Sequence, residues 1–255
     1  MPVTTVGIVG GLGPESTIDY YRRILEAWDR IDSSTAPSII IDSLDVRRAL
    51  HLVGTDRAAL TEYLLSSLGR LAGAGVDFAA MTANTPHIVF DQLAARSPVP
   101  LVSIVEACAV EAQRRGLARM ALLGTRFTME ASFYPAVCAR YGVEVVTPSE
   151  ADRVWIHERY VRELLKGEFR DHTRDRFTSL VGRLQHEEGI HGVILGGTEL
   201  PLLLSSPVIA GVPALDTTEL HVTAIIARLR GSAPRQAEPP APAAGGARVR
   251  EVRAR

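Results

Sequence analysis

Two short polar segments hold the residue types that bind a carboxylate, and the two are built alike. They are Met81-Thr-Ala-Asn-Thr-Pro-His87 and Gly196-Gly-Thr-Glu-Leu-Pro201. Asn and Thr side chains donate hydrogen bonds, and a helix start adds backbone N–H groups, which together suit the several lone pairs of a carboxylate. Asn84, Thr85 and Thr198 are therefore candidate carboxylate ligands. The alternative is that these residues only cap helices.

A third segment, Gly10-Gly-Leu-Gly-Pro-Glu-Ser-Thr17, lies between a predicted strand and a predicted helix. Glycines such as Gly11 let the backbone approach a ligand closely. The segment lacks the G-x-G-x-x-G pattern of dinucleotide sites, and no Gly-Lys-Ser/Thr follows it. It therefore favours a carboxylate over a nucleotide, with a plain strand-to-helix turn as the alternative.

Several charged residues are candidates for proton transfer or for binding a second acidic group. Glu199 and His87 each stand at a predicted helix start, where His87 could equally be a capping or packing residue. Arg47 follows the second predicted strand, and Lys166, the only lysine in the chain, precedes Gly167 at a helix end. Either cation could bind a carboxylate. The alternative for Arg47 is an exposed, solvated side chain, and the alternative for Lys166 is a charge that complements the dipole at the end of its helix.

Neither a metal nor a disulfide is expected. The chain has two cysteines, Cys108 and Cys138, which excludes a disulfide scaffold and a Cys-rich zinc module. Both fall in helical patterns and are predicted to be buried. His157, His172, His186 and His191 have no cysteine at metal-ligand spacing, so no metal is assigned.

Composition bounds the class of protein. The 255 residues include 28 Lys and Arg against 29 Asp and Glu, a formal net charge of −1, which excludes a strongly basic nucleic-acid binder. The apolar fraction of 46% is enough for a buried core. No apolar run reaches the roughly 18 to 20 residues of a membrane span. We expect a cytoplasmic protein with a small-molecule partner, no membrane contact, and a disordered tail over residues 232–255.

Short strands alternate with amphipathic helices, which is typical of α/β proteins with parallel sheets. The predicted strands are Val6–Val9, Ser38–Ile41, Phe78–Met81, Pro100–Ile104, Met120–Leu123, Glu144–Val146, Gly192–Leu195 and Pro213–Leu215. The predicted helices are Ser16–Arg30, Arg57–Ala74, His87–Ala95, Val105–Arg115, Met129–Tyr141, Ala151–Leu165, Arg174–Glu188 and Thr218–Leu229.

The two halves of the chain match each other. Three pairs of similar segments recur at nearly the same separation. Positions 6 and 120 are 114 residues apart, positions 83 and 197 are also 114 apart, and positions 99 and 212 are 113 apart. This predicts two similar Rossmann-like lobes with parallel sheets, related by pseudo-twofold symmetry, with an active-site cleft between them. We expect residues 1–100 and 213–231 to form lobe 1 and residues 101–212 to form lobe 2.

Four motifs resemble those of the aspartate/glutamate racemase superfamily over about residues 5 to 230. They are the glycine-rich segment, Ala83-Asn-Thr-Pro-His, Leu122-Leu-Gly-Thr-Arg-Phe-Thr-Met129 and Val193-Ile-Leu-Gly-Gly-Thr-Glu-Leu-Pro-Leu202. The resemblance implies a cofactor-free isomerase, commonly a homodimer. It assigns the substrate carboxylate to Asn84, Thr85 and Thr198, with Gly11 and Thr125 also in substrate-binding motifs. It further implies that Arg47 and Lys166 bind a side-chain carboxylate.

The resemblance also implies two catalytic cysteines, one in each lobe, at the positions that hold Ala83 and Gly197 in this chain. Neither side chain moves a proton, and losing an acid–base group typically costs ~10²–10⁴-fold in rate. We therefore expect altered isomerase, lyase or cyclase chemistry, with Glu199, His87, Lys166 or the substrate itself moving the proton. The alternatives are a carboxylate-binding protein without catalysis and a racemase that carries engineered substitutions. Gly197 would also admit a larger substrate.

Overall fold

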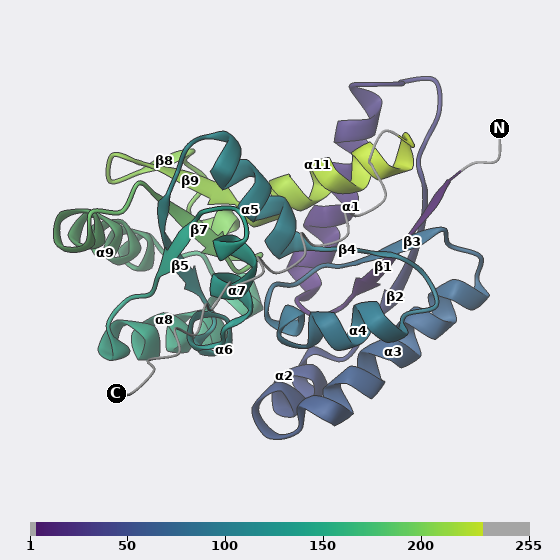
Figure 1. The fold of residues 1–255 in the computed structure, drawn as a ribbon, viewed down its shortest axis with the longest axis horizontal. Coiled ribbons are helices and arrows are strands. Elements are labelled where there is room, and N and C mark those ends of the chain that lie inside the picture. The colour runs from purple at the N-terminus through teal and green to yellow at the C-terminus, as the bar shows by residue number, and fades with distance from the viewer. Residues whose placement is uncertain (1–3, 232–255) are drawn as a thin grey trace, which may run out of the picture.

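The computed structural model describes residues 4–231, which form two α/β lobes (Figure 1). In the first sheet the strand order is β2-β1-β3-β4, and all its strands are parallel. In the second sheet the order is β6-β5-β7-β9-β8, parallel except for β8, which pairs with β9 antiparallel. The strands are β1 (Thr5–Gly10), β2 (Ser38–Ser43), β3 (Phe78–Met81), β4 (Leu101–Val102), β5 (Arg119–Gly124), β6 (Glu144–Val146), β7 (Gly192–Gly196), β8 (Val208–Ile209) and β9 (Val212–Asp216).

The α/β class and the two Rossmann-like lobes are confirmed. The first four strands in each sheet have the same order, with β1, β2, β3 and β4 corresponding to β5, β6, β7 and β9. The central strands β3 and β7 are buried along their whole length. Such strands have both faces covered, which explains their unbroken apolar and small-residue sequences.

Helices cover both sheets. Around the first sheet lie α1 (Pro14–Asp29), α2 (Val46–Thr55), α3 (Arg57–Gly73), the 3₁₀ helix η1 (Thr85–Val89) and α4 (Phe90–Arg96). The later helices are α5 (Ile104–Arg114), α6 (Arg126–Glu130), α7 (Phe133–Ala139), α8 (Glu150–Arg162), η2 (Leu164–Lys166), α9 (Asp171–Glu188), α10 (Leu200–Leu203) and α11 (Thr217–Leu229). Side chains cap several of these helices, as Asp45 does for α2 and Ser103 for α5.

The last helix of each half crosses to the other lobe. Ile104 and Cys108 of α5 pack in the core of lobe 2, although the preceding strand β4 pairs with β3 in the first sheet. Conversely, Val222 and Ile225 of α11 pack in a core with β1, β3 and α1, although β9 pairs with β7 in the second sheet. Figure 1 shows α11 lying beside α1. This exchange fixes the two lobes to each other.

The observed sheets shift the expected lobe boundaries by one strand each. Residues 101–102 belong to the first sheet and residues 213–216 to the second, whereas the expected division had placed them the other way round. The helices α5 and α11 do pack in the lobes to which that division gave them. The strand pattern alone carries no information about which sheet a terminal strand joins, because both sheets offer an open parallel edge.

Two predicted helices are each divided. The predicted helix His87–Ala95 is η1 followed by α4, with a break at Val89, whose φ of −117° and ψ of 20° are not helical. The predicted helix Met129–Tyr141 is α6 and α7, separated where Ala131 is extended. The short elements α2, α10 and β8 were not predicted. The expected disordered tail lies outside the described residues.

Candidate active site

One cavity lies where the carboxyl ends of β3 and β7 face each other, as parallel sheets predict for a ligand site. Ala83, Asn84 and Thr85 line it from the turn after β3, and Gly197, Thr198 and Glu199 line it from the turn after β7. The space that the centre of a water molecule can reach inside the cavity is about 30 Å³, so the cavity is narrow. Its remaining walls are Leu12, Val46, Ala49, Leu50, Val53, Pro86, Thr125, Tyr160 and Leu165. The structure thus brings together the two polar segments that the sequence analysis matched.

Asn84 is held in place by two neighbours. The hydroxyl of Tyr134 donates to Asn84 Oδ1 over 2.5 Å, and Asn84 Nδ2 donates to Thr217 Oγ1 over 3.1 Å. Thr217 in turn donates to the carbonyl of Leu195 in β7. An amide nitrogen carries two hydrogens, so Asn84, which lines the cavity, can donate a second hydrogen bond. The side chain is therefore oriented before any ligand arrives.

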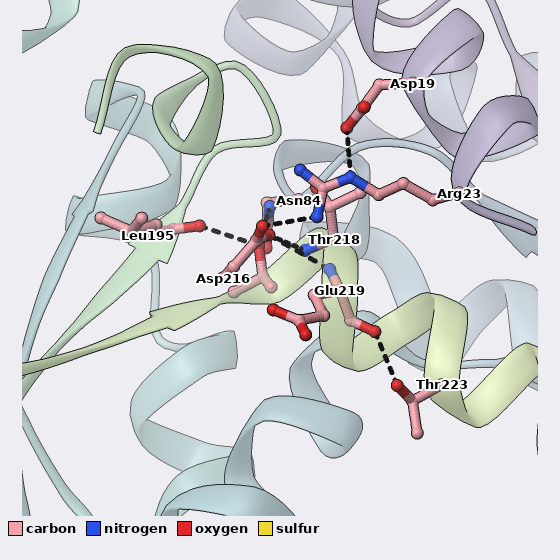
Figure 2. A network of polar contacts seen from close by, with 9 residues as sticks. Asp19, Arg23, Asn84, Leu195, Asp216, Thr218, Glu219 and Thr223 are labelled. Atoms are coloured by element: carbon pink, nitrogen blue, oxygen red, sulfur yellow. Dashed lines mark hydrogen bonds and ion pairs between the residues drawn. The ribbon is translucent and has the colours of Figure 1, made fainter. Parts of the chain in front are cut away.

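The start of α11 supports this arrangement from lobe 1 (Figure 2). Asp216 accepts from the backbone N–H groups of Thr218 at 2.8 Å and Glu219 at 3.1 Å, which caps the helix. Its other oxygen lies 2.7 Å from Nη1 of Arg23 in α1, and Arg23 also pairs with Asp19 at 2.8 Å. The cap and the ion pair hold the residue between them, Thr217, against Asn84.

Threonine hydroxyls connect the two lobes at the cavity. Thr85 Oγ1 lies 3.0 Å from the hydroxyls of both Thr125 and Thr128, which are themselves 3.2 Å apart. Thr125 also caps α6 by accepting from the backbone N–H of Thr128. Thr85 and Thr125 both line the cavity, so these donors sit close together at one wall.

Glu199 is buried, with 2% of its surface exposed, and is surrounded by hydroxyl groups. Ser16 Oγ donates to Oε1 over 2.6 Å, and Tyr160 donates a short hydrogen bond to Oε2. Thr198 Oγ1 is 3.3 Å from Oε2 and 2.7 Å from the Ser16 hydroxyl. Burial raises the pKa of Glu199, and the hydroxyl donors only partly offset it. Within residues 4–231, no Arg, Lys or His side chain lines the cavity.

Tyr160 occupies the space beside Gly197. An ideal Cβ on residue 197 would lie 2.5 Å from both Oη and Cε2 of Tyr160. A phenol therefore fills the volume where the resemblance expects a second cysteine side chain. Tyr160 comes from α8, where it lies four residues from the buried Ile156 and four from the buried Leu164. That spacing marks a buried helix face, but sequence reasoning missed Tyr160 because nothing local shows that this face meets Gly197.

His87 is a structural histidine in this arrangement. Its Nδ1 lies 3.0 Å from the carbonyl of Ala83, and its Nε2 accepts from the backbone N–H of Ile104 at 3.3 Å. Burial lowers the pKa of His87 to about 3, with His221 nearby as a second cause. The ring is thus neutral, joins the turn after β3 to the start of α5, and is not among the residues that line the cavity.

Three other candidate residues lie away from the cavity lining. Arg47 and Lys166 have exposed side chains. The N–H of Gly11 donates to Thr17 Oγ1 over 2.8 Å, so it is already used within the loop. Gly11 has a φ of +74°, and a Cβ there would overlap the backbone of Leu44, so close packing requires this glycine.

Cys108 and Cys138 are both buried, as predicted, in the core of lobe 2. Burial raises the pKa of both thiols, that of Cys138 to about 12. Neither thiol lines the cavity. Residues 4–231 contain no group of three or more His, Cys, Asp or Glu side chains placed to hold a metal ion. No helix in the same range is long and apolar enough to cross a membrane.

The sequence model of the Asp/Glu/hydantoin racemase family matches residues 9–225. The chain belongs to this family. Two solved structures superpose on this chain over nearly their whole length. An aspartate racemase homologue from Pyrococcus horikoshii is 33% identical, with a TM-score of 0.76 over 89% of this chain and 99% of that one. A putative Asp/Glu racemase from Yersinia pestis is 32% identical, with a TM-score of 0.80 over the same shares.

A curated relative shows more limited similarity. The broad specificity amino-acid racemase RacX of Bacillus subtilis is 28% identical over 148 residues, which make up 55% of this chain. The matched segment spans 63% of the length of RacX.

Proposed function

We propose that this member of the Asp/Glu/hydantoin racemase family binds a small carboxylate, an amino acid or a related acid, and acts at the carbon next to the carboxylate. The observation that carries the proposal is the convergence of Asn84, Thr85, Thr125 and Thr198 on one cavity between the lobes. Oriented hydrogen-bond donors of this kind stabilise the enediolate-like anion that forms when a bond to that carbon breaks.

The chemistry differs from racemisation by two thiols. Ala83 and Gly197 supply no acid or base, and Cys108 and Cys138 are buried in the lobe 2 core. An isomerase, lyase or cyclase reaction in which one group moves the proton fits the groups that do line the cavity. The family membership and the amino-acid racemase RacX among the relatives support an isomerase-type enzyme.

The cavity favours a substrate with an apolar arm over one with a second carboxylate. Leu12 and four residues of α2, Val46, Ala49, Leu50 and Val53, supply an aliphatic wall. Arg47 and Lys166, the candidate partners for a second carboxylate, are exposed and do not line the cavity. Burying an unpaired carboxylate against such a wall would carry a large desolvation cost.

Two alternatives make other predictions. The first alternative is a carboxylate-binding protein without catalysis. It is favoured because backbone hydrogen bonds already occupy polar groups near the cavity that could have moved a proton, such as both ring nitrogens of His87. A racemase with engineered substitutions is disfavoured by Tyr160, because its ring fills the space beside Gly197 and leaves no room there for a cysteine.

Proton exchange in D₂O separates these possibilities. The protein is incubated with L-alanine, L-valine, L-leucine, L-aspartate, L-glutamate and methylmalonate, and the signal of the proton on the carbon next to the carboxylate is followed by NMR. We expect loss of that signal with at least one amino acid that has an apolar side chain, L-alanine, L-valine or L-leucine. Binding by calorimetry without any reaction would instead establish the non-catalytic alternative, and absence of binding would overturn the carboxylate site.

A further inference from the structure

We propose that the Tyr160 hydroxyl, hydrogen-bonded to Glu199, is the proton-transfer group on the lobe 2 side of the cleft, in the place of a thiol on residue 197. The inference rests on the proposed function, because it names the group that moves the proton at the same site. It starts from position: Oη of Tyr160 is 2.5 Å from where a Cβ on Gly197 would be, so it lies where the side chain of residue 197 would begin.

The phenol is both oriented and connected. Tyr160 lines the cavity, and its hydroxyl donates to Glu199 Oε2. The phenol oxygen also accepts a hydrogen bond from the backbone N–H of Glu199, over 3.5 Å. On its far side Glu199 accepts from Ser16 Oγ at 2.6 Å, and Ser16 belongs to α1 in lobe 1. A chain of hydrogen bonds therefore runs from the cavity through Tyr160 and Glu199 to the other lobe.

Proton transfer along these hydrogen bonds conserves both protons and charge. The phenol oxygen takes the proton from the substrate carbon, while the phenol's own proton passes to Oε2 of Glu199. The electron pair of the broken C–H bond moves into the substrate carboxylate, which becomes an enediolate held by the donors of Asn84, Thr85 and Thr198. Glu199 loses its negative charge as the substrate gains one, so no net charge is created in the cavity. The reverse transfer returns a proton to the same carbon.

The surroundings favour the carboxylate as the base and the phenol as the relay. Burial and the neighbouring carboxylate raise the pKa of Tyr160 well above its usual value, so the hydroxyl keeps its proton at rest. Burial also raises the pKa of Glu199, which makes its carboxylate a stronger base than an exposed one. Among the described residues 4–231, none that hydrogen-bonds to Glu199 is a cation, so no ion pair within this range holds the carboxylate in its charged form.

The arrangement acts from one side. Ala83 stands at the matching position in lobe 1 and supplies only a methyl group. A proton removed by Tyr160 is therefore replaced on the face from which it left. The expected product in D₂O is a deuterated substrate with unchanged configuration, which distinguishes this group from a two-sided racemase.

Substitutions with matched controls test the role of Tyr160. Tyr160→Phe keeps the ring beside Gly197 and removes only the hydroxyl. Tyr20→Phe is the control, because Tyr20 is also buried and donates its hydroxyl, at 2.9 Å, to His221 away from the cavity. Glu199→Gln is compared with Glu163→Gln, since Glu163 is equally buried but accepts from Arg159 and Thr173. The readouts are exchange rate of L-valine, L-leucine or L-alanine in D₂O, their Kd by calorimetry, and Tm.

We expect Tyr160→Phe to slow exchange ~10²–10⁴-fold, the usual effect of losing an acid–base group, with Kd changed less than about threefold. Tyr20→Phe should alter Tm without slowing exchange at temperatures where it is folded. The exchange rate of the wild-type protein should rise with pH as Glu199 loses its proton, and Glu199→Gln should abolish that rise while Glu163→Gln keeps it.

Two results would overturn the inference in different ways. If the wild-type protein exchanges substrate and Tyr160→Phe exchanges it equally fast with the same pH profile, the role of Tyr160 is wrong and the proposed function stands. If the wild-type protein binds these amino acids but neither exchanges them nor converts methylmalonate, the proposed catalysis fails and the role of Tyr160 fails with it.

Discussion

The phenol ring of Tyr160 and the backbone of Gly197 are in such close contact that residue 197 has no space for a side chain. An ideal Cβ there would lie 2.5 Å from Oη and Cε2 and 2.8 Å from Cζ of the ring. These two residues, from α8 and from the turn after β7, therefore depend on each other. The phenol therefore occupies the space beside the backbone of residue 197 at this end of the cavity.

Gly197→Ala tests this dependence. The added methyl group overlaps the ring, and overpacking of a core typically costs about 1–3 kcal/mol of unfolding free energy. Tyr160→Leu in the same chain should relieve most of that loss, because the smaller side chain leaves room for the methyl group. Urea denaturation of the two single variants and the double variant gives the coupling free energy between residues 160 and 197. Strictly additive losses would show that the two residues do not compete for space.

Cysteines introduced at positions 83 and 197 should also require a smaller side chain at position 160. Ala83→Cys with Gly197→Cys places two thiols at the ends of β3 and β7, but the second thiol overlaps Tyr160. We expect inversion of alanine, followed by chiral chromatography, only when Tyr160→Leu is added to the pair. Equal inversion by the two-cysteine variant with Tyr160 present would contradict the packing argument, and a folded triple variant that binds alanine without inverting it would show that the cysteine positions are misassigned.

The exposed cations should contribute little to substrate affinity. Arg47→Ala and Lys166→Ala are expected to change the Kd of L-valine less than about threefold, because neither side chain lines the cavity. Thr85→Val, which removes a donor from the cavity wall, should weaken binding at least tenfold, since a hydrogen bond to a charged group contributes roughly 1.5–3 kcal/mol. Calorimetric titration measures all three. A large loss on Lys166→Ala would show that the lysine reaches the bound substrate.

Buried histidines should make stability depend on pH. The pKa values of His87 and His221 are lowered by burial to about 3 and about 4, whereas an unfolded histidine has a value of about 6.5. Between these values the unfolded chain binds more protons, so stability is fully present above about pH 6.5 and is lost as the pH falls. Each histidine should contribute a slope of up to about 1.4 kcal/mol per pH unit.

His87→Gln checks this prediction, because the amide can bond to the same two backbone groups and does not titrate. The slope of unfolding free energy between pH 6 and pH 5 should be smaller in the variant than in the wild-type protein. An identical slope in both would mean that His87 is protonated in the folded state or that it is not buried.

The general architecture could be predicted from the sequence because its signals are local. Alternating short apolar strands and amphipathic helices indicated the parallel sheets, and matched segments such as those around Ala83 and Gly197 indicated two similar lobes. The turn residues at strand ends indicated where a ligand binds. The same turns line the cavity in the structure.

What the sequence left open depends on contacts between distant segments. The neighbour that fills the space beside Gly197 comes from position 160, which the sequence placed only within the predicted helix Ala151–Leu165. Whether His87 titrates depended on Ile104 and on its own turn, which together occupy both ring nitrogens. The positions of Arg47 and Lys166 were matched by resemblance, and only the fold shows that aliphatic residues of α2 and Leu165 form the wall there.

The stereochemical course of proton exchange shows whether a single group on the lobe 2 side of the cavity moves the proton. The protein is incubated with L-valine, L-leucine or L-alanine in D₂O, and the recovered amino acid is examined by NMR for deuterium and by chiral chromatography for configuration. We predict deuterium at the carbon next to the carboxylate with the L configuration retained, because Tyr160 acts from one face and Ala83 supplies nothing on the other. Deuterium incorporation accompanied by an equal rate of inversion would contradict this account.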